Sequence, residues 1–211
     1  MVVAGMKFAV AVLAVLLTGG CSSLPPGVAT QPLTWQSLPL QPVPVGHIPE
    51  DIRLRNWSAR SDGSGSCVYA SHRNAKRATG DSRGDAYWDR QRQQAGWEGG
   101  ETLHGLLTRY RQSSQPYIAT EDTDMRIWEI AGRARRPGVI SYLPRHAQTC
   151  FGIQTDPQTG ERIAVLLDNN RTGAYTAVDA DVFRDAWRYC GGWGVIPWDK
   201  PATPFTFSRF R

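Results

Sequence analysis

A cysteine, a histidine and an Asp-Asn-Asn sequence stand where they could perform nucleophilic catalysis together. Cys67 follows the glycine- and serine-rich residues 62–66 and begins a segment with helical character. The backbone N–H groups and the dipole of a helix N-terminus lower the pKa of a thiol, and the thiolate is the nucleophilic form. His146 opens a predicted strand, and Asp168 and Asn169 end the next strand. An imidazole oriented by a carboxylate or an amide can exchange a proton with a nearby thiol.

The pattern of apolar and turn residues predicts the elements that would position these groups. Helices are expected over residues 67–77, 85–94, 102–112, 124–135 and 181–189, and strands over residues 138–143, 147–154, 162–167, 175–178 and 193–197. Most of the predicted helices precede the predicted antiparallel strands along the chain, and this order predicts an α+β fold. Residues 156–160 form a hairpin turn between two strands, so the His146 end of one strand should lie beside the Asp168 end of the other.

This order of landmarks resembles the papain-like cysteine peptidases, particularly the compact bacterial branch that includes the double-glycine leader (bacteriocin-processing) peptidases. The matching segments are residues 65–71, 145–147 and 165–170, within a resemblance that covers residues 56–197. The resemblance implies a helical part carrying the nucleophile, packed on a C-terminal antiparallel sheet.

The same resemblance implies a role for each candidate residue. Cys67 would be the nucleophile, and His146 the general base and acid. Asp168, or alternatively Asn169, would orient the imidazole. Neighbouring residues of a strand point to opposite faces, so the sequence leaves that choice open. The implied substrate is a peptide or a related amide, hydrolysed through an acyl-thioester intermediate.

The oxyanion hole is where the chain departs from the family pattern. The family usually has a glutamine shortly before the cysteine, at the position that Ser61 occupies here. The Cys67 backbone N–H would supply one donor, and Asn56 is the candidate for another. Losing one such donor typically costs about 10²–10³ in rate. A papain-like lipoprotein that binds or scaffolds without turnover, and a transglutaminase-like acyltransferase, are therefore alternatives to the hydrolase.

The first residues of the chain resemble an export signal. Lys7 precedes the ten-residue apolar run 8–17, which as a helix would rise about 15 Å, half of a bilayer core. Such a run suits a signal peptide better than a permanent span. The following Thr-Gly-Gly-Cys21 resembles a bacterial lipoprotein signal, in which the cysteine is lipidated; an ordinary secretory signal is the alternative. We therefore expect a location in the bacterial cell envelope, facing the periplasm or the exterior.

The chain divides into four segments by composition. Residues 1–20 are the predicted signal peptide. Residues 21–50 hold seven of the 14 prolines and are expected to form an extended tether. Residues 51–200 would form the catalytic domain, and residues 201–211 a tail that is either a loose end or a partner contact.

Composition and spacing argue against other classes of function. The net charge of +5 is spread along the chain, so no nucleic-acid partner is expected. No glycine-rich phosphate loop and no Cys-x-x-Cys or His-Glu-x-x-His spacing occurs, so no cofactor and no metal are expected. The expected partners are the substrate and, through lipid on Cys21, the membrane.

Two further cysteines leave a redox question open. An exported protein meets an oxidising compartment, and Cys150 and Cys190 could form a disulfide there. Two buried free thiols are the other possibility. Cys150 lies four residues after His146 in the same strand, so a disulfide or a metal at Cys150 would compete with peptidase chemistry if both pointed into the cleft.

Overall fold

The structure of the chain is a computed structural model, which describes residues 40–57, 65–82, 85–94, 100–143, 146–198 and 201–210. All of these residues belong to one compact unit. The predicted signal peptide, Cys21 and the first part of the predicted tether lie outside the described residues. Among the described helices, none is both long enough and apolar enough to cross a membrane.

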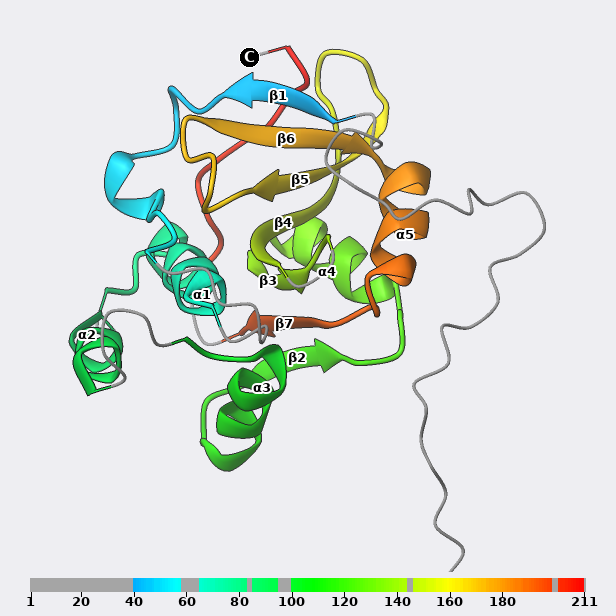
Figure 1. The fold of residues 1–211 in the computed structure, drawn as a ribbon. Coiled ribbons are helices and arrows are strands. Elements are labelled where there is room, and N and C mark those ends of the chain that lie inside the picture. Colours follow the sequence, from blue (N-terminus) through cyan, green and yellow to red (C-terminus); the bar gives the residue numbers. More distant parts are fainter. Residues whose placement is uncertain are drawn as a thin grey trace, which may run out of the picture. The chain divides into compact units, whose positions relative to one another are not determined.

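An antiparallel sheet of seven strands runs through the described part of the chain (Figure 1). Its strand order is β1-β6-β5-β4-β3-β7-β2, and every neighbouring pair is antiparallel. The strands are β1 (Gln41–Pro44), β2 (Tyr117–Thr120), β3 (Gly138–Ser141), β4 (Ala147–Thr155), β5 (Arg162–Leu167), β6 (Ala174–Asp179) and β7 (Gly194–Pro197). This confirms the α+β fold class.

Helices cover both faces of the sheet, and they match the predicted segments within a few residues. They are α1 (Cys67–Ala78), α2 (Asp85–Gln94), α3 (Leu103–Gln112), α4 (Arg126–Ala134) and α5 (Ala180–Tyr189), with a short 3-10 helix, η1 (Glu50–Ile52). Thr102 caps α3 by accepting the Gly105 N–H at 2.9 Å, and Asp179 caps α5 by accepting the Asp181 and Val182 N–H groups. These side chains satisfy N–H groups that have no partner inside the helix.

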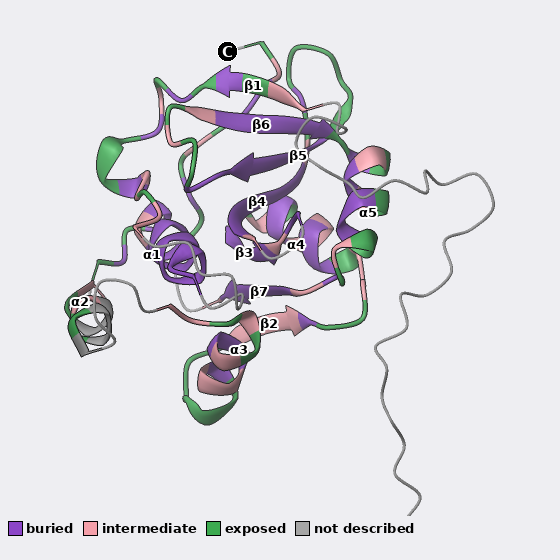
Figure 2. Ribbon diagram, in the orientation of Figure 1, coloured by how far each residue is buried: buried purple, intermediate pink, exposed green. Residues whose placement is uncertain are grey.

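The alternation of side chains along β5 shows how the core is divided. Ala164 and Leu166 pack in one cluster with α4 and α5, whereas Ile163, Val165 and Leu167 pack in another on the opposite face. β5 is buried on both faces (Figure 2), which explains its continuous apolar sequence. The helix α1 packs against β3 and β4, and its first residues join the apolar side chains of α3.

The helix α1 is buried almost all round, although it contains several basic residues. Arg73 forms ion pairs with Asp85 at 3.1 Å and Asp89 at 2.8 Å, and Lys76 pairs with Asp81 at 3.2 Å. A buried charge is tolerated only when it is paired. These pairs allow the helix that begins at Cys67 to be enclosed, and they attach α2 to it.

The predicted boundaries of the tether and the tail are wrong. Residues 41–44 form β1 at the edge of the sheet. Val43 in this strand and the following Val45 and Ile48 are buried. An edge strand tolerates prolines, which cannot donate to the sheet ladder. At the other end, Phe207 is 1% exposed and lies against Phe151 and Tyr175, with ring centroids at 4.7 and 5.1 Å. The domain therefore begins before residue 51 and extends beyond residue 200.

Replacing Phe207 by Ala tests whether the C-terminal segment belongs to the core. Loss of this buried ring should lower the free energy of unfolding by about 3–5 kcal/mol. Phe210 is 62% exposed, so Phe210→Ala is the matched control and should change it by less than about 0.5 kcal/mol. Urea denaturation followed by tryptophan fluorescence measures both variants. Equal, small effects would show that the segment is not part of the folded core.

Candidate active site

The helix α1 places Cys67 at its first position, next to the buried Ser66. The Ser66 hydroxyl accepts the Trp57 N–H at 2.9 Å and donates to the side-chain oxygen Oδ1 of Asn56. These bonds tie the incoming segment to the start of the helix. A residue at this position has an N–H with no partner inside the helix, and it sits at the positive end of the helix dipole. Both features favour negative charge on or beside Cys67.

The hairpin between β3 and β4 carries His146. The Tyr142 N–H donates to the His146 carbonyl at 3.1 Å, and the His146 N–H donates to the Leu143 carbonyl at 3.2 Å. Since β4 begins at Ala147 and packs against α1 (Figure 1), the imidazole reaches the start of that helix. There it lowers the pKa of the Cys67 thiol by hydrogen bonding and by its positive charge.

Asp168 is the carboxylate that braces the imidazole. Its Oδ1 lies 2.7 Å from His146 Nε2, and the two side chains are only 3% and 12% exposed. The structure therefore brings Cys67, His146 and Asp168 into one hydrogen-bonded series from α1, the β3–β4 hairpin and the end of β5. This is the juxtaposition that the antiparallel pairing of β4 and β5 predicts.

Asn169, the alternative to Asp168, has a different place in the structure. Its amide Nδ2 donates to Ser71 Oγ and to the Ala147 carbonyl, both at 2.8 Å, and lies 3.1 Å from the Cys67 carbonyl. The residue is fully buried. Asn169 therefore joins α1 to β4 beneath the site, whereas Asp168 contacts the imidazole.

The charges of Cys67 and His146 support each other. Burial by itself would raise the pKa of the Cys67 thiol, but the hydrogen bond from His146, the Ala147 N–H and the positive charge of His146 lower that pKa overall. Burial would lower the pKa of His146, yet hydrogen bonds with Asp168 and Cys67 raise it to about 9. Both shifts favour a thiolate beside an imidazolium over the neutral thiol and imidazole.

Two asparagines lie at the exposed side of the imidazole. Asn170 Nδ2 lies 3.4 Å from His146 Nε2, and the Asn170 N–H donates to Asp168 at 2.9 Å. The Asn56 amide donates to Asn170 Oδ1 at 3.3 Å, and the Asn56 N–H donates to the Asn169 carbonyl at 2.8 Å. Sequence reasoning missed Asn170, whose only signal was its place in the Asp-Asn-Asn sequence. Asn56 lies beside the site, and its role as an oxyanion donor stays a prediction.

The other thiols of the described chain do not compete with this chemistry. Cys67, Cys150 and Cys190 are all free, so the Cys150–Cys190 disulfide is not formed. Cys150 packs in the cluster with α4 and α5, on the opposite face of the sheet from Cys67. Burial raises the pKa of Cys150 and raises that of Cys190 to about 11. Among the described residues, no group of three or more His, Cys, Asp or Glu side chains could hold a metal.

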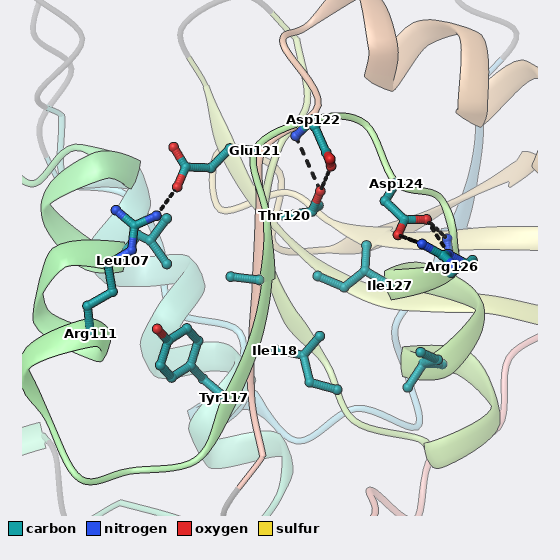
Figure 3. A pocket seen from close by; sticks show the side chains of 12 residues that line it. Leu107, Arg111, Tyr117, Ile118, Thr120, Glu121, Asp122, Asp124, Arg126 and Ile127 are labelled. Carbon is teal, nitrogen blue, oxygen red and sulfur yellow. Dashed lines mark hydrogen bonds and ion pairs between the residues drawn. The ribbon is translucent and has the colours of Figure 1, made fainter.

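A groove of about 620 Å³ lies elsewhere, along β2 between α3 and α4 (Figure 3). Tyr117 points toward α3 and Ile118 toward α4. The charged groups at its rim are paired, because Arg111 contacts Glu121 and Arg126 contacts Asp124 at 2.6 Å. Neither the thiol, the imidazole nor the carboxylate of the candidate site lines this groove, so it is separate from the catalytic constellation.

Comparisons of the chain with protein-family models, with curated proteins and with solved structures found no match.

Alkylation with iodoacetamide at pH 7 should distinguish the three thiols. Only the thiolate reacts, so the lowered pKa of Cys67 and the raised pKa values of Cys150 and Cys190 predict selective modification of Cys67, faster than Cys190 by about 100-fold. Peptide mapping by mass spectrometry measures each site. Cys67→Ala is the control and should remove the fast phase. Comparable modification of Cys190, or an unreactive Cys67, would contradict the proposed ion pair.

Proposed function

We propose that the protein is a papain-like cysteine hydrolase that cleaves a peptide or a related amide through an acyl-thioester intermediate. The observation that carries the proposal is the series Cys67–His146–Asp168, with Asp168 2.7 Å from the imidazole. A nucleophile, a proton carrier and an orienting carboxylate arranged in series are what acyl transfer to sulfur requires. Lipid on Cys21 would hold the enzyme at the bacterial envelope.

The first half of the proposed reaction forms the acyl-enzyme. The Cys67 thiolate attacks the carbonyl carbon, a C–S bond forms, and the carbonyl oxygen becomes an oxyanion. The Cys67 N–H at the start of α1 would stabilise that oxygen, and Asn56 is the candidate for a further donor. The His146 imidazolium then donates its proton to the leaving nitrogen as the C–N bond breaks.

The second half releases the acid. Neutral His146 takes a proton from water, whose oxygen attacks the thioester carbonyl. Collapse of the second oxyanion breaks the C–S bond, and the thiolate and imidazolium are restored. Asp168 keeps one ring nitrogen occupied, so that the other faces the sulfur throughout.

The arrangement of the elements supports the papain-like assignment. A buried helix that begins at the nucleophile packs on the strands β3 and β4, and the hairpin between these strands presents the histidine. The carboxylate follows the adjacent strand β5. This is the layout that the resemblance implies for the family.

Two other functions use the same residues differently. A scaffolding protein needs no activated thiol, so the lowered pKa of Cys67 favours an enzyme over a binding protein. A transglutaminase-like enzyme would transfer the acyl group to an amine instead of water.

Substrate assays with a library of fluorogenic peptide amides test the proposal. We expect release of the fluorophore by the parent protein and none by Cys67→Ala. Repeating the assay with an added primary amine separates the two enzyme classes, because a hydrolase yields the acid and an acyltransferase yields the amide, which mass spectrometry distinguishes. Equal turnover by the parent and Cys67→Ala would contradict the mechanism.

The pH dependence of kcat/KM should be bell-shaped. Activity should rise as Cys67 ionises, below the ordinary thiol pKa, because the thiol form is not nucleophilic. It should fall with an apparent pKa of about 9, because His146 loses the proton that the leaving amine needs. A profile that keeps rising beyond pH 9 would contradict the role of His146 as the acid.

Asp168→Asn should weaken catalysis and move the alkaline limb. Removing the carboxylate that raises the pKa of His146 should shift this limb toward lower pH. Since the imidazole would also be less well oriented, kcat should fall by about 10²–10⁴. Asp181→Asn, on the exposed side of α5, is the control and should leave both quantities unchanged. If the alkaline limb of the pH profile is unchanged in Asp168→Asn, Asp168 does not act on His146.

A further inference from the structure

We propose that Cys190 is a positioning residue for His146, because its sulfur accepts a hydrogen bond that fixes the turn carrying the imidazole. The inference rests on the proposed function, since it concerns the general base of that site. Cys190 is not assigned contact with the substrate; it acts through the backbone groups of Leu143 and His146.

Two hydrogen bonds connect the Cys190 sulfur to the His146 backbone through one residue. Cys190 is the C-cap of α5, and its Sγ accepts the Leu143 N–H at 3.1 Å. The carbonyl of the same Leu143 accepts the His146 N–H at 3.2 Å. The thiol therefore orients the Leu143 backbone at its N–H, and the Leu143 carbonyl in turn orients the His146 backbone.

Leu143 needs such an anchor because its backbone is strained. Its φ angle is +78°, in the left-handed region that a non-glycine residue rarely adopts. Backbone strain of this kind persists only where the surrounding structure enforces it. The leucine side chain is buried in the core with α4 and α5, and the sulfur supplies the partner for its N–H.

The segment that supplies the sulfur is itself fixed to the β3 end of the hairpin. Ser141 Oγ donates to the Cys190 carbonyl at 3.0 Å, and the Ser141 N–H donates to the Trp193 carbonyl at 3.1 Å. Gly192, with φ +66°, lies so close to Thr123 that a Cβ would stand 2.1 Å from its methyl group. The backbone around Cys190 is thus held by contacts on both sides, so its sulfur can hold the Leu143 N–H in a fixed position.

The chemistry of Cys190 suits a positioning role. Burial raises the pKa of its thiol to about 11, so the group stays neutral at the pH at which Cys67 reacts. A neutral thiol sulfur is a weak acceptor, sufficient to select one backbone conformation. The nucleophile and the anchor are in this way chemically distinct, although both are cysteines.

The pH dependence of Cys67 alkylation tests this role without a known substrate. Cys190→Ala should let the His146 imidazole move away from the Cys67 sulfur, so the apparent pKa of Cys67 should rise. The alkylation rate at pH 6 should then fall by about two- to tenfold, the effect of one hydrogen bond. Loss of stability alone would leave the apparent pKa of the folded molecules unchanged.

Cys150→Ala is the matched control. Its sulfur also accepts a backbone N–H, from Gly152 at 3.3 Å, but in the core away from the hairpin. This variant should keep the parental profile within about twofold. Cys190→Ser keeps an acceptor and should lie closer to the parent than Cys190→Ala does. Circular dichroism verifies that each variant is folded.

The outcomes separate this inference from the proposed function. A parental profile in Cys190→Ala, or an equal shift in Cys150→Ala, would overturn the positioning role while the proposed function stands. An ordinary thiol pKa for Cys67 in the parent would instead contradict the proposed function. If Cys190→Ala does not fold, Ser141→Ala replaces it, because this variant removes only the hydrogen bond to the Cys190 carbonyl. Ser141→Ala should also raise the apparent pKa of Cys67 alkylation. An unchanged pH dependence in Ser141→Ala would overturn the inference.

Discussion

The contact between the Cys67 thiol and the His146 imidazole is the interaction on which the account depends. In a largely buried site, either charge alone would be costly, but together they stabilise each other. Asp168 makes the arrangement possible, since its carboxylate balances the imidazolium from the other side. In its ion-paired form the site holds alternating charges, and the pKa of His146 depends on both Asp168 and Cys67.

The fold serves this contact by fixing α1 against the strands that carry the other two groups. Asn169 joins the first turns of α1 to the start of β4 through one amide. The Thr149 hydroxyl adds a bond to the Ser71 carbonyl at 3.1 Å. The ion pairs of Arg73 and Lys76 allow the helix to be enclosed. Neighbours in an Asp-Asn-Asn sequence therefore divide two tasks: one braces the imidazole, and the other joins helix to sheet.

The sequence predicted the helices and strands around Cys67, His146 and Asp168 better than it predicted the edges of the domain. The antiparallel pairing of two strands was enough to predict that His146 and Asp168 lie side by side. The position of Cys67 depends in addition on the packing of α1 against β3 and β4. Residues 41–44 were missed because their prolines favour an extended tether, and a tether and an edge strand have the same local backbone. Phe207 and the partners of Asn169 were beyond prediction, because they depend on long-range packing that no local pattern records.

The protonation state of His146 at neutral pH tests the central claim most directly. Nitrogen-15 chemical shifts of its imidazole, assigned by their absence in His146→Gln, report whether one or both ring nitrogens carry a proton. We expect an imidazolium at pH 7 that loses its proton with a pKa of about 9, raised by Asp168 and Cys67. A neutral ring at pH 7 that titrates near its ordinary pKa of about 6.5 would contradict it.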